Sequence, residues 1–250
     1  MALLYNGIDD YTLIADHAAL ALGDAAPNSG PWSIACWFRR DVMSDAVPRY
    51  LFNWGVSGNP SVMVFTYGSG SAEYGKIFVW IRDSLGVGTY LATSPTTDGA
   101  WRHLCLAFDG TTFVVYIDAV PRATATVANW GVIDVAGAWN LGQYAAGSNR
   151  FAGALAETAK WDRALSSDER TALASGAPAA LFPVGLAWSL PMLAGARPEF
   201  ARLNVTDASS GAVEHPPKYF LPRRPKVLAA PRGVRPRIVF HSPVFRSPVV

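Results

Sequence analysis

Short runs of apolar or alternating residues recur about every ten residues along most of the chain, with turn residues between them. Clear runs cover residues 33–39, 50–54, 61–67, 76–81, 103–108, 113–117 and 153–161. Gly, Asn, Asp and Pro fill the gaps, for example at Asp98-Gly99 and Asp109-Gly110. Evenly spaced short strands with such turns predict an all-β protein, an antiparallel β-sandwich or jelly roll.

Two local motifs sharpen this prediction. Residues 104–108 and 113–117, joined by Asp109-Gly110-Thr111-Thr112, are typical of a hairpin. Ser166-Ser167-Asp168-Glu169 is a capping box, and Gly176 suits the position just past a helix end, so one short helix is predicted between them. We expect this helix to cover an edge or an end of the sandwich.

The pattern loosens after Pro178, where residues 185–190 predict one more strand and residues 191–215 are expected to be polar and irregular. Eight prolines among residues 216–250 forbid helix and discourage central strands. We therefore expect two parts: a sandwich domain at 1–215, with its core in 1–176, and an extended C-terminal arm at 216–250.

Composition agrees with a large buried core, because half of the residues are hydrophobic and only 16% are charged. No apolar run approaches ~20 residues, so no membrane span is expected. The first residues lack a basic segment followed by a long apolar one, which predicts synthesis in the cytosol without a signal peptide. Cys36 and Cys105 both lie mid-strand and are expected to be buried thiols rather than a disulfide.

The net charge of +2 hides an asymmetry between the two parts. The arm has no Asp or Glu and eight basic residues, whereas the rest of the chain has thirteen basic and nineteen acidic residues. The eight are Lys218, Arg223, Arg224, Lys226, Arg232, Arg235, Arg237 and Arg246. A cationic tail on an acidic body indicates that the tail has a binding role of its own.

Four stretches, in order, carry a family resemblance. They are Asn6-Gly7-Ile8-Asp9-Asp10-Tyr11, Trp32-Ser33-Ile34-Ala35-Cys36-Trp37-Phe38, the hairpin from Trp101 to Asp118, and the segment from Phe151 to Ser166. Together they resemble the laminin-G-like, concanavalin A-type jelly-roll family over residues 1 to about 176. The resemblance implies that fold and a role in binding sugars, proteins or surfaces, but no particular ligand.

The chain departs from the family pattern at two places. Ala156 stands where the family has Asp before Glu157, and Asp118-Ala119 stands where it has Asp-Gly. The first departure removes one carboxylate that a cation could use.

Hydrolase chemistry is not expected. A jelly-roll glucanase needs two carboxylates that flank the glycosidic bond, and carboxylates two apart on a strand share a face. The chain has five Glu and none has an acidic residue two positions on; Glu157 is followed by Ala159 and Trp161 on its predicted face. The four His are scattered without metal-ligand spacing. We predict that the protein is not an enzyme.

Two weaker binding patterns remain open. Asp9 and Asp10 lie at a predicted turn and offer a possible calcium site, but turn formation explains them better, so no cofactor or metal is expected. Trp130, Trp139 and Tyr144, close to Trp161, are possible sugar-binding residues, although Trp on alternating strands also suits the core.

Three hypotheses about the function of the arm are open. Its basic residues could contact phosphates of a nucleic acid, or the arm could add a strand to a neighbouring subunit, or it could be a solvated tail. The apolar residues Ile238, Phe240 and Phe245 favour docking on protein, so these three and the eight basic residues are the predicted partner-binding set.

These observations lead to one main hypothesis and one alternative. The main hypothesis is a non-enzymatic structural or decoration protein of a tailed-phage virion, homo-oligomeric, made in the host cytoplasm and docked on a capsid or tail through its arm. The alternative is a carbohydrate-binding module or lectin that recognises cell-surface glycans.

Overall fold

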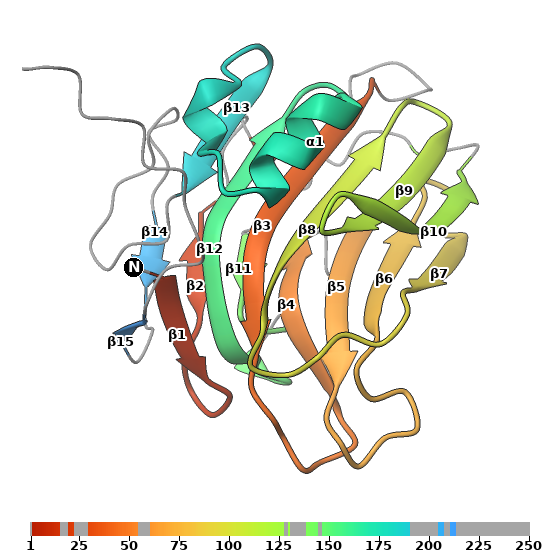
Figure 1. The fold of residues 1–250 in the computed structure, drawn as a ribbon. Coiled ribbons are helices and arrows are strands. Elements are labelled where there is room, and N and C mark those ends of the chain that lie inside the picture. The colour runs from red at the N-terminus through yellow and green to blue at the C-terminus, as the bar shows by residue number, and fades with distance from the viewer. Residues whose placement is uncertain are drawn as a thin grey trace, which may run out of the picture. The chain divides into compact units, whose positions relative to one another are not determined.

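The computed structural model describes residues 2–15, 20–22, 30–54, 61–127, 130, 139–144, 147–190, 205–207 and 211–213. Its strands form two antiparallel sheets that pack face to face with most of the buried side chains between them (Figure 1). The predicted all-β sandwich of the jelly-roll class, with one short α-helix, is confirmed. The arm at 216–250, and with it the boundary near 215, lies outside the described residues.

The first sheet has eight strands. In spatial order these are β10 (Val120–Thr126), β9 (Thr112–Ile117), β8 (Trp101–Phe108), β3 (Trp32–Arg40), β12 (Ala152–Trp161), β1 (Ala2–Asn6) and β15 (Gly211–Val213), while β13 (Leu186–Leu190) also pairs with β12. The long strand β12 accommodates two neighbours on the same side, because β1 pairs with its first half and β13 with its second.

The second sheet has seven strands. Their order is β14 (Val205–Asp207), β2 (Thr12–Ile14), β11 (Trp139–Leu141), β4 (Pro48–Trp54), β5 (Ser61–Tyr67), β6 (Ile77–Arg82) and β7 (Gly88–Ala92). The edge strand β7 contacts β10, the edge strand of the first sheet. Residues 191–215 were expected to be irregular, and this is wrong at β14 and β15, which extend the two sheets beside β2 and β1.

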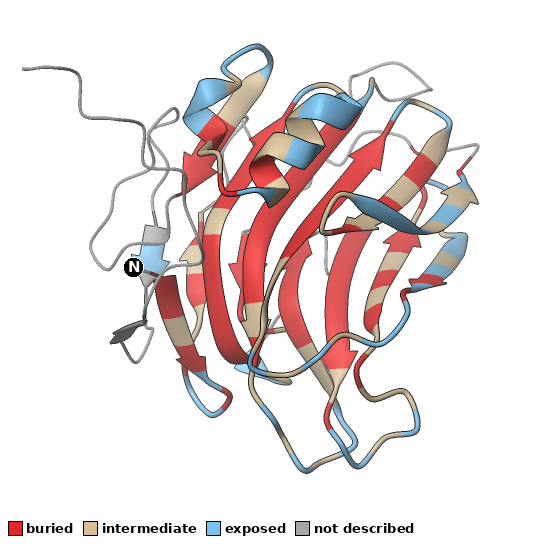
Figure 2. Ribbon diagram, viewed as in Figure 1, coloured by how far each residue is buried: buried red, intermediate tan, exposed pale blue. Residues whose placement is uncertain are grey.

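Alternation of side chains between the two faces places the core. In β6, Ile77, Val79 and Ile81 are at most 1% exposed, whereas the residues between them are only half-buried. The buried positions of both sheets turn toward each other, and Figure 2 shows this as continuous red bands along the central strands. The predicted hairpin is confirmed as β8–β9, with the Asp109 carboxylate accepting hydrogen bonds from the amides of Thr111 and Thr112 at 2.9 and 2.7 Å.

Helix α1 (Ser167–Ala174) begins at the predicted capping box. The Ser166 hydroxyl accepts from the Glu169 amide at 3.3 Å, and the Glu169 carboxylate accepts from the Ser166 amide at 2.8 Å. Gly176, at φ 97°, ends the helix in the left-handed conformation that favours glycine. A short 3-10 turn (Ala179–Leu181) follows.

The position of α1 corrects the expectation that it covers an edge or end. The helix lies on the outward face of the eight-stranded sheet (Figure 1). Its one buried residue, Leu173, joins a cluster with Ala35, Cys105 and Trp161, which are outward-facing residues of β3, β8 and β12. The outward face was free to take the helix because these strands carry small or apolar residues on both sides.

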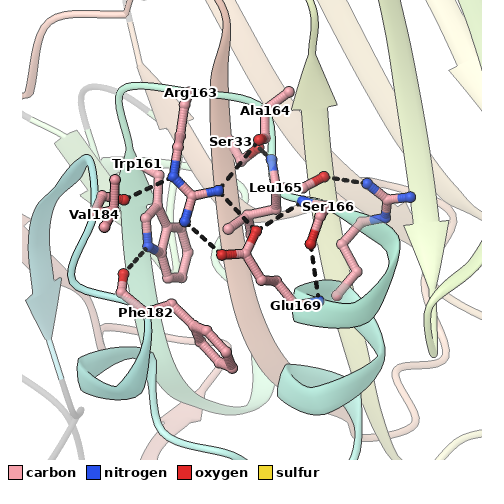
Figure 3. Close-up of polar contacts among 10 residues, drawn as sticks. Ser33, Trp161, Arg163, Ala164, Leu165, Ser166, Glu169, Phe182 and Val184 are labelled. Atoms are coloured by element: carbon pink, nitrogen blue, oxygen red, sulfur yellow. Dashed lines mark hydrogen bonds and ion pairs between the residues drawn. The ribbon is translucent and has the colours of Figure 1, made fainter. Parts of the chain in front are cut away.

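An arginine–carboxylate pair fastens the helix to the sheet (Figure 3). Arg163 donates to both carboxylate oxygens of Glu169 at 2.7 and 2.6 Å, and its Nε donates to the Val184 carbonyl at 2.7 Å. Ser33 Oγ on β3 accepts from the Leu165 amide at 3.0 Å. The same Glu169 thus caps the helix and binds the arginine, and the ion pair holds the pKa of Glu169 down to about 2.

The two cysteines are free and buried, as predicted. Ala35 pairs with Cys105 and Cys36 with Leu104, so the two thiols lie on opposite faces of the sheet and cannot join. Among the described residues, no helix has the length and apolar character needed to cross a membrane.

Candidate functional site

The outward face of the seven-stranded sheet carries a group of aromatic side chains, which we call the aromatic face. Strands β4 to β7 supply most of them through the positions that alternate with core residues, and the segment after β11 supplies one more. Its members are Tyr50, Phe65, Tyr67, Phe78, Trp80, Tyr90 and Tyr144, with Met63 packed among them. The cross-strand pairing sets them side by side, since Phe65 is directly opposite Phe78 and Trp80 opposite Tyr90.

Ring geometry makes this face a continuous platform. The rings of Phe65 and Phe78 stack at a centroid distance of 5.4 Å and 12°, and those of Trp80 and Tyr90 at 5.2 Å and 8°. The ring of Tyr50 packs against those of Phe65 and Tyr144, with centroid distances of 5.1 and 4.8 Å. Stacked rings hold one another in place, so the platform is rigid before any ligand arrives.

Exposure increases along the platform toward the edge strand. Tyr50 on β4 is 8% exposed, whereas Tyr90 on β7 is 61% exposed. The indole of Trp80 lies over the backbone of Gly88, where a Cβ would come within 2.6 Å of the indole nitrogen. Gly88 therefore leaves room for the indole of Trp80 as it stacks against Tyr90, and the open end of the platform is this Trp80–Tyr90 pair.

Buried amides border the other end of the aromatic face. Asn53 Nδ2 donates to the Gln143 carbonyl at 3.1 Å, Asn140 Nδ2 to Asn53 Oδ1 at 3.3 Å, and Gln143 Nε2 to Asn140 Oδ1 at 3.1 Å. Gln143 precedes Tyr144, so these amides fix the segment that carries Tyr144 to β4 and β11.

The phenols of Tyr50 and Tyr90 stay neutral. Burial raises the pKa of Tyr50 to about 12, and burial also raises the pKa of Tyr90. A neutral phenol both donates and accepts a hydrogen bond. An uncharged face of stacked rings with hydroxyl groups at its margin can pack against the C–H face of a sugar ring and bond to the ring's hydroxyls.

Two of the three residues predicted to bind sugar do not lie on a surface. Trp130 and Trp139 are 1% and 0% exposed, which contradicts that role. Trp139 packs against Trp188 at 5.0 Å and Trp130 against Trp32 at 5.6 Å, both inside the core. Trp139 points inward from β11, and Trp130 also packs into the core, as the core interpretation of these tryptophans allowed.

Tyr144 is half-buried and belongs to the aromatic face. Sequence reasoning missed its other members, although Phe78 and Trp80 alternate with aliphatic residues in β6 and so mark a second apolar face. The predicted partner-binding residues between Lys218 and Arg246 lie outside the described residues.

The candidate calcium residues act within their turn. Asn6 donates from its amide to Asp10 Oδ2 and from its side chain to Asp9 Oδ1, both at 2.7 Å. Throughout the described part of the chain, no three His, Cys, Asp or Glu side chains come together in a way that could hold a metal ion. Both carboxylates accept hydrogen bonds from Asn6 within the turn.

The surroundings of Glu157 differ from the prediction. Ala156 pairs with Trp37 and Ala159 with Ala35, so β12 has an extra residue at this point, and Glu157 has a φ of 53°. The bulge interrupts the alternation that was expected to place Glu157 on one face with Ala159 and Trp161. His103 is 2% exposed and packs edge-on against Trp37, with a ring-centroid distance of 5.3 Å, and burial lowers its pKa to about 4.

Comparison with known proteins matches the chain to one family. The model of the concanavalin A-like lectin/glucanases superfamily matches residues 9–169. No curated protein sequence matches the chain.

Solved structures with the same fold share little sequence with this chain. A heptameric SAP-like pentraxin from Limulus polyphemus is 14% identical with a TM-score of 0.51, over 70% of this chain and 81% of its own. A putative carbohydrate binding protein from Bacteroides ovatus is 14% identical with a TM-score of 0.54, over 83% of this chain and 59% of its own. The binding domain of botulinum neurotoxin serotype G is 10% identical with a TM-score of 0.50, over 69% of this chain and 46% of its own. The match thus spans less than two thirds of the latter two structures.

Proposed function

The chain belongs to the concanavalin A-like lectin/glucanases superfamily, and on that premise we propose that it is a non-enzymatic carbohydrate-binding protein that takes sugar on the aromatic face. The observation that carries the proposal is the exposed Tyr90 stacked on the half-buried Trp80 at the open end of the platform. The fold it shares with a putative carbohydrate binding protein from Bacteroides ovatus supports it.

The pair has the properties that sugar binding needs. A half-buried indole and a phenol that is 61% exposed present flat apolar surface with a hydroxyl at its margin. The guanidinium carbon of Arg82 lies over the indole ring, 5.9 Å from the ring centroid, and Arg82 Nε donates to the Gly86 carbonyl at 3.3 Å. The arginine thus brings a positive charge and further hydrogen-bond donors to this end of the platform.

The absence of enzymatic activity belongs to the same proposal. The sequence has five Glu with no acidic residue two positions on, which is unlike the clustered carboxylates of jelly-roll glucanases. A screen for release of reducing sugar from the glycans that the protein binds tests this point, and turnover of any of them would overturn it.

The binding test is a glycan array followed by calorimetric titration of the sugars that bind. We expect Tyr90→Ala to weaken binding about two- to tenfold, since stacked aromatic rings contribute about 0.5–1.5 kcal/mol beyond their buried area. Tyr11→Ala, which removes a half-buried tyrosine from the turn before β2, is the matched control and should bind normally. No binding to any glycan by the wild type, or equal loss in both variants, would reject the proposal.

A second proposal concerns the arm. Its eight basic residues and lack of acidic ones favour docking on an acidic protein surface of a larger assembly, such as a phage capsid or tail, with the sandwich displayed outward. In this proposal the protein is a homo-oligomeric virion component. Deletion of residues 216–250 should abolish incorporation into particles while glycan binding persists, and unchanged incorporation would reject this role.

A further inference from the structure

A polar cleft lies apart from the aromatic face, where the turn between β9 and β10 meets the segment that leads from β7 to β8. It has a volume of about 80 Å³ and its walls include Ser94, Thr96, Arg102, Asp118 and Arg122. A volume of ~10–15 Å³ on this measure admits one water, so the cleft admits several. A small polar group fits there, whereas a whole sugar ring does not.

The charges in the cleft are unbalanced. Arg102 and Arg122 face one carboxylate, that of Asp118. Both carboxylate oxygens of Asp118 already accept a hydrogen bond, one from Arg102 Nη1 and the other from the His103 amide, each at 2.9 Å. The remaining positive charge is therefore not neutralised by the walls.

Both arginines keep unused donors. Arg102 Nε is buried and has no hydrogen-bond partner. Arg122 is exposed and, among the residues that the structure describes, takes part in no hydrogen bond or ion pair. A buried N–H without a partner carries a desolvation penalty, so the guanidinium of Arg102 is not fully satisfied by the described residues.

The backbone directs Arg122 toward this place. Pro121 pairs with Tyr116 and Ala123 with Val115, so Arg122 is the extra residue of a β-bulge in the edge strand β10. Bulges re-aim a side chain away from the regular alternation. Without the bulge, Arg122 would be one more member of an edge strand that alternates between the two faces of the sheet.

We propose that this cleft binds an oxyanion, namely a sulfate, phosphate or carboxylate group, between Arg102 and Arg122. Guanidinium groups match the geometry of such oxygens through parallel charge-assisted hydrogen bonds. Ser94 adds a hydroxyl that can donate to a third oxygen. A cation is disfavoured because two like charges already line the cleft. The site is independent of sugar binding on the aromatic face and of the charges in residues 216–250.

The test compares the binding of sodium sulfate, sodium phosphate and sodium acetate with that of sodium chloride at equal ionic strength, by calorimetric titration of the full chain. Arg122→Gln removes the exposed guanidinium, and it should fold normally because that side chain has no partner among the residues that the structure describes. Arg39→Gln, on the outward face of the same sheet, is the matched control for the loss of one charge. Residues 216–250 are the same in all three proteins, so their contribution cancels.

We expect one of the oxyanions to bind the wild type and Arg39→Gln equally, and Arg122→Gln at least about tenfold more weakly, as loss of a hydrogen bond to a charged group predicts. Preference for sulfate and phosphate over acetate identifies a tetrahedral group as the ligand, and the reverse identifies a carboxylate. Equal affinity of wild type and Arg122→Gln, or equal weakening in Arg39→Gln, would overturn the proposal.

Discussion

The two-residue turn between β9 and β10 stores strain that a single substitution should release. Asp118 and Ala119 have φ of 53° and 62°, as a type I′ hairpin turn requires. Asp118 compensates through its carboxylate, which accepts from the His103 amide and Arg102 Nη1. Ala119 has no side-chain hydrogen bond to offer in return. We predict that Ala119→Gly stabilises the protein.

The expected gain follows from two opposing effects. The left-handed conformation costs an L-residue with a Cβ about 1–2 kcal/mol. Glycine gains more conformational freedom in the unfolded chain, which offsets about 0.4–1 kcal/mol of that strain. The free energy of unfolding should therefore rise by about 0.5–1 kcal/mol, or the melting temperature by roughly 1–4 °C for a domain of this size.

Urea unfolding followed by tryptophan fluorescence measures this change. Ala92→Gly is the matched control, because Ala92 is an exposed residue of strand β7 whose φ is not positive. There glycine should lower the free energy of unfolding by about 0.5–1 kcal/mol. If Ala119→Gly is no more stable than wild type, or loses as much as Ala92→Gly, the reasoning about strain in this turn is refuted.

Three further predictions concern the helix and the thiols. The pKa of Glu169 lies near 2 instead of its usual 4.5, so the contribution of its carboxylate to stability is complete above pH 4.5 and is lost as the pH falls toward 2. Glu169→Gln should therefore lower the free energy of unfolding at pH 7 by on the order of 1 kcal/mol and flatten the dependence of stability on pH between 4.5 and 2. An unchanged acid unfolding curve would contradict the ion pair with Arg163. Leu173→Ala should cost about 2–4 kcal/mol in thermal or urea unfolding, because Leu173 is the buried anchor of α1, and a cost below ~1 kcal/mol would place the helix elsewhere. Burial raises the pKa of Cys36 and Cys105 to about 12. A thiol reagent at pH 8 should therefore modify neither cysteine in the folded protein and both cysteines in urea. Rapid modification of the folded protein would contradict their burial.

Local patterns in the sequence were sufficient for several elements. The capping box at Ser166 and Glu169 predicted where α1 begins, because its hydrogen bonds join residues three apart. The runs at 61–67 and 185–190 correspond to β5 and β13 within one residue. Cys36 and Cys105 both lie mid-strand, and that position was sufficient to predict that both are buried free thiols.

Other elements depended on partners far along the chain. The three-residue strands β14 and β15 have too few residues for any period to be read, and they exist because β2 and β1 offer open edges. The outward face under α1 could not be foreseen either, since Ala35, Cys105 and Trp161 come from three strands that only the fold brings together.

The candidate sites also show which features the sequence predicts and which depend on the tertiary structure. The residue types at Trp130, Trp139 and Tyr144 suited both a core and a sugar platform, and only the packing of the two sheets decided that the tryptophans are buried. The sequence by itself determined that short alternating strands form a sandwich with an acidic body and a basic arm. The tertiary structure alone decided which aromatic rings meet at Trp80 and Tyr90, because strand register is set by long-range pairing and not by any local hydrogen bond.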